Sequence, residues 1–159
     1  MNKQKICTFY IVRHGETEWN VKGFYQGSSD MLLNKLGEEQ AKSLARKLQH
    51  IRFDAIFSSD LLRASKTAEA VALERQMEVK TTEILRERSW GSLEGRSAEY
   101  ARNELKDAFA KFETLSEQEK FAFKFVEDME SFDEVLPRFI TFIRELAVHM
   151  LGKQFWLFV

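Results

Sequence analysis

Short apolar runs alternate along this chain with longer stretches in which apolar residues return every three or four positions. Continuous apolar runs of this length predict strands, and the helical spacing predicts amphipathic helices. Strands are expected at Ile6 to Val12, at Phe53 to Ser59, within 77–85 and at Lys153 to Val159. The first run, "ICTFYIV", is rich in β-branched and aromatic residues, a pattern typical of a strand buried on both faces.

The stretches between these runs predict long helices over 36–51, 59–74 and 131–150. Ser59 or Asp60 is expected to cap the second of these helices. The third opens with Ser131 and Glu134 at the spacing of a capping box. Pro137 offers a second place for that helix to begin, because proline is favoured in a first turn and disfavoured further inside.

Strands that alternate with helices indicate an α/β fold, a three-layer sandwich with a mostly parallel sheet between helices. We expect one domain over 1–159, in which the charged helical segment 97–128 is an insert or lid. Ligands of such sheets bind beyond the carboxyl ends of the strands. Arg13 and His14 follow the first strand, and Ser58 to Arg63 lie at the end of the second, so these residues should meet there.

The composition narrows the possible partners. The 159 residues are 44% hydrophobic, and 24 basic residues balance 25 acidic ones. This balance provides no broad field for nucleic acid or an anionic membrane, so an anion must bind at a local cluster. No apolar run approaches the ~20 residues that span a bilayer. The single cysteine, Cys7, excludes an internal disulfide and fits a reducing compartment, so we expect a cytoplasmic protein.

Three interpretations compete for Arg13-His14. His14 could be a structural residue at the end of a strand. Cys7 and Arg13 have the C-x5-R spacing of a thiol phosphatase, but six residues of strand span roughly 20 Å, so the two side chains cannot share one phosphate. In the third interpretation His14 is a nucleophile, because a neutral imidazole can carry a phosphoryl group.

Phosphoryl transfer to a histidine requires cations for the phosphoryl oxygens and an acid for the leaving group. Arg13 adjoins His14, and Arg63 lies in the first turn of a helix, where the amides and the helix dipole also favour an anion. Glu87, between Arg86 and Arg88, is the candidate acid. Neither a metal nor another cofactor is required if these arginines supply the positive charge.

The stretches "VRHGETEWN", "QG", "SSDLLRASKTAE" and "LRERSWGSLEG" occur in this order before residue 96. Together they resemble the histidine phosphatase superfamily, in its phosphoglycerate mutase-like branch. The resemblance implies a phosphohistidine intermediate on His14, phosphoryl binding by Arg13 and Arg63, and proton donation by Glu87. The residues implied to contact phosphate or substrate are Asn20, Gln26, Gly27, Arg88 and Trp90.

Structural interpretations of these residues compete with the functional ones. They are Arg63 on a helix surface, Glu87 in an ion pair with Arg86 or Arg88, Asn20 and Gln26 in turns, and Trp90 in the core.

The family pattern contains a second histidine, in a Ser/Thr-His-Gly motif directly after the last core strand. That strand corresponds to "QFWLFV", after which the sequence ends at Val159, so we expect a domain truncated at its C-terminal side. Loss of one such donor costs about 100-fold to 1000-fold in rate. The apolar last strand is also expected to be exposed unless covered, which would favour a homodimer or strand pairing with another chain.

The favoured function is hydrolysis of a small phosphorylated metabolite that resembles a sugar phosphate. A mutase must hold a substrate with two anionic ends, but 97–123 mixes basic with acidic residues and has no adjacent arginine pair. Phosphoglycerate mutase-type phosphoryl transfer is therefore the alternative, together with a truncated, non-catalytic remnant that binds phosphate or a protein partner.

Overall fold

The computed structural model describes residues 6–159, so the first five residues of the expected domain lie outside the described part. It contains the parallel strands β1 (Thr8–Val12), β2 (Ala55–Ser59), β3 (Val79–Thr82) and β4 (Gln154–Phe158). They form one sheet in the order β1-β4-β2-β3. Trp156 of β4 is paired with Tyr10 on one side and with Ile56 on the other. The expected α/β fold with a parallel sheet is confirmed.

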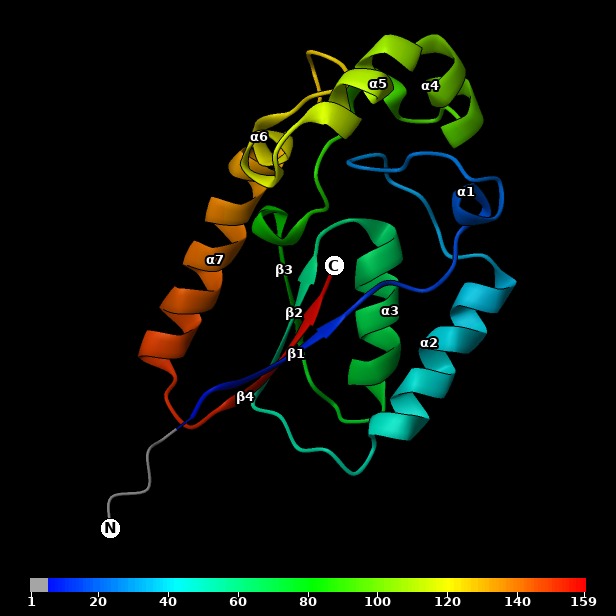
Figure 1. The fold of residues 1–159 in the computed structure, drawn as a ribbon. Coiled ribbons are helices and arrows are strands. Elements are labelled where there is room, and N and C mark those ends of the chain that lie inside the picture. The colour runs from blue at the N-terminus through cyan, green and yellow to red at the C-terminus, as the bar shows by residue number, and fades with distance from the viewer. Residues whose placement is uncertain (1–5) are drawn as a thin grey trace.

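Helices cover both faces of this sheet (Figure 1). α2 (Lys35–Leu48) and α3 (Leu62–Leu73) lie on one side, and α7 (Phe132–His149) lies on the other. The main core lies under α2 and α3 and consists of Ala45, Ile56, Ala68, Val71, Ala72, Trp156 and Phe158. On the opposite face Phe57 packs edge-on against Phe142 of α7, with 5.5 Å between ring centroids. Neighbouring residues of β2 thus point into different layers, as the pleat requires.

The burial expected for the first and last strands is wrong in both cases, for one reason. β4 is inserted between β1 and β2, so both of its edges are paired and Phe155 to Phe158 are buried. The last strand therefore offers no free edge for pairing with another chain. β1 is left at the edge of the sheet, where 57% of Ile11 is exposed.

One predicted helix start is wrong, and the structure decides between the two starts that were offered for another helix. The N-cap of α3 is Leu61 rather than Ser59 or Asp60, and the Leu62 N–H donates to the distant Asp30 carboxylate at 2.6 Å. α7 begins at Phe132 and continues through Pro137. The Ser131–Glu134 capping box, which is present, therefore decides where α7 starts.

The remaining elements are α1 (Glu18–Val21), α4 (Ala98–Glu104), α5 (Lys106–Thr114), α6 (Glu117–Ala122) and the 3₁₀ helices η1 (Glu83–Leu85) and η2 (Gly91–Leu93). In Figure 1, α4 and α5 lie beyond the carboxyl ends of the strands, within the segment expected to be an insert or lid. Its rings of Phe109, Phe112, Phe123 and Phe125 contact one another. No helix within residues 6–159 is both long and apolar enough to cross a bilayer.

Candidate active site

The loop that carries His14 is anchored on both sides. His14 N–H donates to the Val159 carbonyl at 3.0 Å, which continues the pairing of β1 with β4. Gly15 N–H donates to the Thr67 hydroxyl of α3 at 3.0 Å. A side chain at residue 15 would collide with the carbonyl of Gly37, so glycine allows the loop to pass close to α2.

The His14 imidazole is oriented by its own loop. Its Nδ1 lies 2.6 Å from the Gly15 carbonyl oxygen, which can only accept, so Nδ1 carries the hydrogen and Nε2 keeps its lone pair. Burial lowers the pKa of His14 from 6.5 to about 4; the Gly15 bond opposes this shift, and the charges of Arg63 and Arg13 add to it. At neutral pH the ring is therefore an uncharged potential nucleophile.

Arg63 is almost completely buried, with only 1% of the residue exposed. Its guanidinium donates to the carbonyls of Gly27 at 2.6 Å and Ser29 at 2.8 Å, and it contacts a Glu87 carboxylate oxygen at 3.3 Å. Burial lowers the pKa of Arg63, while the Glu87 charge opposes that shift. The interpretation of Arg63 as a helix-surface residue is wrong, since this buried cation faces the loops beyond the sheet.

Glu87 lies two residues after η1 and is held through both carboxylate oxygens. One oxygen contacts Arg63, and the other accepts a hydrogen bond from the Trp90 indole N–H at 3.1 Å. Its side chain is 41% exposed, so solvent reaches the carboxylate. The ion pair expected with Arg86 or Arg88 is not the one observed, because Arg86 instead pairs with Asp60, with Nε 2.7 Å from a carboxylate oxygen.

Arg88 and Trp90 form the next part of the cluster. The Arg88 guanidinium lies over the Trp90 ring at 3.8 Å and over the Phe132 ring at 4.4 Å. Burial lowers the pKa of Arg88, and the Glu87 charge opposes this. Trp90 also packs against Tyr25, with 4.4 Å between centroids, and is only half-buried. These contacts join it to Glu87, so it is not simply a core residue.

Asn20 and Gln26 are connected through Thr17, which is fully buried. Thr17 and Asn20 form the capping box of the short helix α1. The Thr17 hydroxyl also lies 2.7 Å from the Gln26 side-chain oxygen. Asn20 thus has a local structural role at the start of α1, as the turn-residue interpretation expects. Gln26 is buried and is linked to Thr17 by a hydrogen bond.

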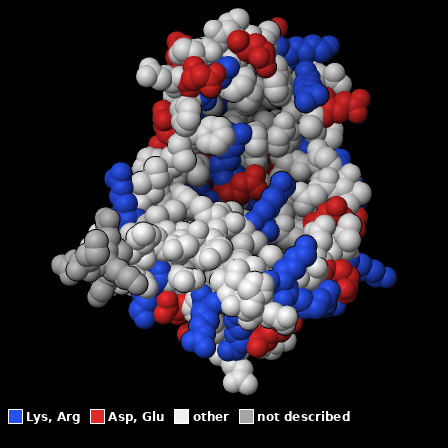
Figure 2. Space-filling model, turned by 60° about the horizontal axis from the view of Figure 1, so that its bottom comes forward, with Lys and Arg blue, Asp and Glu red and all other residues white. Residues whose placement is uncertain are grey.

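An open hollow of about 390 Å³ is lined by Arg13, His14, Glu16, Asn20 and Gln40. Figure 2 shows basic and acidic side chains interspersed over one face of the molecule, with both colours in a central hollow. Within residues 6–159 no cluster of three His, Cys, Asp or Glu side chains is placed to hold a metal ion.

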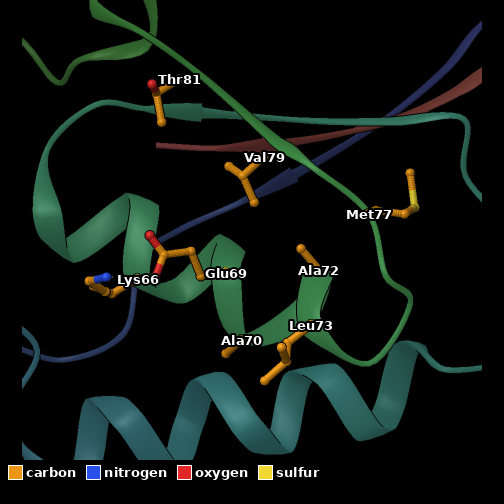
Figure 3. Close-up of a pocket in the computed structure, with 8 residues that line it drawn as sticks. All are labelled: Lys66, Glu69, Ala70, Ala72, Leu73, Met77, Val79 and Thr81. Carbon is orange, nitrogen blue, oxygen red and sulfur yellow. Dashed lines mark hydrogen bonds and ion pairs between the residues drawn. The ribbon is translucent and has the colours of Figure 1, made fainter.

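A larger hollow, of about 540 Å³, lies between α3 and β3 (Figure 3). Its lining is mostly apolar, and its one basic residue, Lys66, forms an ion pair with Glu69 at 2.7 Å. Neither His14 nor Arg63 lines it. Of the residues expected from the sequence, Arg13, His14 and Asn20 line the smaller hollow. Glu87 lines a separate hollow of about 390 Å³ together with Ser28 and Arg138.

The model of the histidine phosphatase superfamily (branch 1) matches residues 9–159 of this chain. The chain belongs to the histidine phosphatase superfamily. The match covers nearly all of the described residues, including His14, Arg63 and Glu87.

Relatives of this superfamily member carry both mutase and phosphatase names. It is 45% identical over 87 residues to "Probable phosphoglycerate mutase GpmB" of Proteus mirabilis, a match that covers 55% of this chain and 40% of the relative. It is 34% identical over 108 residues to "Uncharacterized phosphatase PhoE" of Bacillus subtilis, covering 67% and 56% of the two chains. The matches thus span about half the length of these relatives.

A solved structure shares the fold of this histidine phosphatase superfamily chain. YhfR of Bacillus stearothermophilus superposes with a TM-score of 0.84 at 29% identity. The superposition covers 96% of this chain and 73% of YhfR. The phosphoglycerate mutase-like fold expected from the motifs is confirmed.

Two side chains of this superfamily member were missed by the sequence interpretation. Thr67 joins the His14 loop to α3: its hydroxyl accepts from Gly15 and donates to the Arg63 carbonyl at 2.7 Å. The spacing of Arg63 and Thr67, four residues apart on one helix, signals their contact with each other but not the contact of Thr67 with Gly15. Glu94 accepts hydrogen bonds from two separate loops, and its spacing in the sequence carries no such signal.

Proposed function

We propose that this chain hydrolyses a small phosphomonoester, of the sugar phosphate kind, through a phosphohistidine intermediate on His14. The observation that carries the proposal is the orientation of the imidazole, with Nδ1 held by Gly15 and Nε2 free. The low pKa of His14, about 4, keeps this nitrogen unprotonated at neutral pH. Arg13 and Arg63 both add positive charge near the ring, where a phosphoryl group would be bound.

Arg63 of α3 can bind phosphoryl oxygens while it keeps its hydrogen bonds to the loop of Gly27 and Ser29. A guanidinium has five N–H donors, of which the contacts to Gly27, Ser29 and Glu87 use three. The remaining donors are already oriented by these bonds, so little side-chain entropy is lost on binding. Asn20 lines the hollow with His14, and we assign it to the same phosphoryl group.

The first step is attack of His14 Nε2 on phosphorus. The phosphorus–oxygen bond to the leaving alcohol breaks, its electron pair stays on that oxygen, and the proton of the Glu87 carboxyl group passes to it. A bound phosphoryl dianion would compete with Glu87 for Arg63, so an uncharged carboxyl group suits the occupied site. The Glu87 side chain is 41% exposed, so a leaving group can approach its carboxyl group from the solvent side.

The second step returns the enzyme to its initial state. Water attacks the phosphorus and gives a proton to the Glu87 carboxylate, while the phosphorus–nitrogen bond breaks and its electrons return to Nε2. The products are the alcohol and inorganic phosphate. Arg88, stacked on Trp90, lies beside Glu87 in the sequence and is assigned to the leaving group, with Gln26 and Gly27 at the entrance. We assign the segment 97–128 to a lid over this site.

Phosphoglycerate mutase-type transfer is the second candidate, because relatives with that name share the motifs. Several cations in and beside the lid segment already have partners: Lys120 pairs with Glu117, Lys124 pairs with Glu134, and Arg96 lies over Tyr100. They are therefore less able to hold a second anionic end of a substrate, which favours hydrolysis.

The test uses p-nitrophenyl phosphate and the purified chain, with His14→Ala as control. The wild type is expected to release phosphate both with and without a chelator, and His14→Ala is expected to release none above background. A denatured sample quenched during turnover should carry a phosphoryl label that acid removes and His14→Ala lacks. Equal release by both proteins would overturn the proposal and leave a chain that at most binds phosphate. When a second alcohol is supplied, formation of its phosphate ester in place of inorganic phosphate would favour the mutase.

A further inference from the structure

The carboxylate of Glu94 connects the loop of Ser28 and Ser29 with the loop of Ser89 and Trp90, which lie far apart in the sequence. It accepts hydrogen bonds from the Ser28 N–H at 2.9 Å and the Ser29 hydroxyl at 2.6 Å. It also accepts from the Trp90 N–H at 3.0 Å and the Ser89 hydroxyl at 3.1 Å. Four donors on a half-buried carboxylate are far more than a surface glutamate needs.

Each of these loops holds one member of the candidate active site. The first loop accepts both backbone hydrogen bonds of Arg63, through the carbonyls of Gly27 and Ser29. The second loop carries Trp90, whose indole N–H donates to the Glu87 carboxylate. Arg63 and Glu87 contact each other at 3.3 Å, which closes a ring of contacts from Glu94 through both loops and back.

The packing inside this ring is tight. Gly27 has a φ of +53°, a conformation that favours glycine. A Cβ atom at this position would overlap the Glu94 carboxylate and lie 2.8 Å from the Trp90 nitrogen. The first loop is therefore pressed against Glu94 and cannot shift toward it, while the hydrogen bonds prevent a shift away.

Glu94 is ionised in this arrangement. Burial opposes the charge, but the hydrogen bonds from Ser29, Ser28, Trp90 and Ser89 outweigh it and lower the pKa of Glu94. A charged acceptor forms stronger bonds than a neutral one, which stiffens both loops.

We propose that Glu94 is a positioning residue that sets the separation between Arg63 and Glu87, the residues to which the proposed function assigns phosphoryl binding and proton donation. Glu94 itself touches no reacting atom. The inference rests on that proposed function for its catalytic consequence, whereas its structural part, the closed ring, stands independently.

The kinetic test compares two phosphomonoesters, one with p-nitrophenol as leaving group and one with a simple alkyl alcohol. The alkyl ester depends strongly on a placed acid, and the p-nitrophenyl ester depends on it weakly. Glu94→Ala should lower kcat for the alkyl ester about 100-fold, the effect of a displacement of about 1 Å in a reacting group. The p-nitrophenyl ester should lose about tenfold or less, and KM should change less than kcat.

The conservative variant Glu94→Gln keeps one acceptor oxygen and should restore most of the alkyl-ester rate. Glu39→Ala, which removes an exposed carboxylate paired with Lys42 on α2, is the matched control and should leave both rates unchanged. If Glu94→Ala does not fold, Glu94→Asp applies the same comparison, because it withdraws the carboxylate by one methylene and keeps its charge. Unchanged rates for both esters, or equal losses for both, would overturn the positioning role.

A second readout does not depend on turnover. The NMR signal of the Trp90 indole N–H reports its bond to Glu87, and Glu87→Gln provides the reference position of the perturbed signal. In Glu94→Ala the Trp90 signal should move away from its wild-type position, and in Glu94→Gln it should return. An unmoved Trp90 signal in Glu94→Ala would refute the ring of contacts. The proposed function fails by a different result, a wild-type rate equal to that of His14→Ala, so the two failures can be told apart.

Discussion

Arg63 and Trp156 are almost equally buried, at 1% and 2% exposed, but their surroundings differ completely. The Arg63 guanidinium has two carbonyl acceptors and a carboxylate partner. Trp156 lies among rings, with Tyr10 stacked on it at 4.9 Å, and its indole N–H is a buried donor without a partner among the described residues. The loops beyond the sheet thus bury polar groups in satisfied networks, whereas the centre of the sheet buries apolar area.

This difference predicts that mutations in the two regions affect different quantities, the catalytic rate in one and the folding stability in the other. Burial of apolar area supplies most of the free energy of folding, and a satisfied buried charge contributes little or even opposes it. Residues around Arg63 should therefore control rate with modest effects on stability, and residues around Trp156 should control stability with modest effects on rate.

Replacement of the nucleophile should show the largest effect on the polar side. His14→Ala should lower kcat/KM for a phosphomonoester by at least about 1,000-fold, because the covalent step is lost. Its thermal midpoint at pH 7 should change little, since the imidazole is largely uncharged in both the folded and the unfolded chain at that pH. Rate assays together with thermal unfolding check both halves, and a destabilised His14→Ala would contradict the division.

Truncation of a core side chain should have the next largest effect, in this case on the free energy of unfolding. Trp156→Ala should lower the free energy of unfolding by about 3–5 kcal/mol through the lost burial and the cavity left behind. Trp156→Phe should cost less, because it also removes the unpartnered N–H. Urea unfolding measures both variants, and kcat of the folded fraction should stay within a few-fold of the wild type.

Thr67 lies between the two regions and should show a smaller, mixed effect. Thr67→Val keeps the shape but removes the hydroxyl that joins Gly15 to Arg63, and it leaves the buried Gly15 N–H without its acceptor. The expected cost is about 1–3 kcal/mol in stability, with a rate loss of about tenfold. Thr67→Ser should recover the rate. If Thr67→Ser recovered the stability but not the rate, the hydroxyl would not be what positions His14.

The titration of His14 should have no effect on stability at pH 7 and should appear only in acid. Its pKa is about 4 in the folded state and 6.5 as an ordinary value, so the folded protein keeps the ring neutral where the unfolded chain protonates it. Stability should therefore decline as pH falls from about 6.5 toward 4, with no contribution from His14 at pH 7. NMR titration of the imidazole, assigned with His14→Ala, measures this pKa directly; a midpoint near 6.5 would contradict a desolvated ring.

Much of the fold could be predicted because the local signals agree with it. The alternation of apolar runs with helical spacing identified the strands, α2, α3 and α7, and the capping box marked the start of α7. Strand order could not be predicted, since apolar content is similar in "ICTFYIV" and "QFWLFV". Only pairing across the sheet puts β4 in the centre and β1 at the edge.

The sequence by itself determined the set of reactive residue types: a histidine at the end of a strand, arginines after two strands and a carboxylate in a glycine-rich turn. These follow from local spacing, because strand ends and helix starts are encoded by neighbouring residues. Only the tertiary structure decided that Glu87 pairs with Arg63 rather than with its sequence neighbours. It alone also brought Thr67 and Glu94 to the loops that they join. Such contacts depend on distances between segments far apart in the chain, which no local pattern specifies.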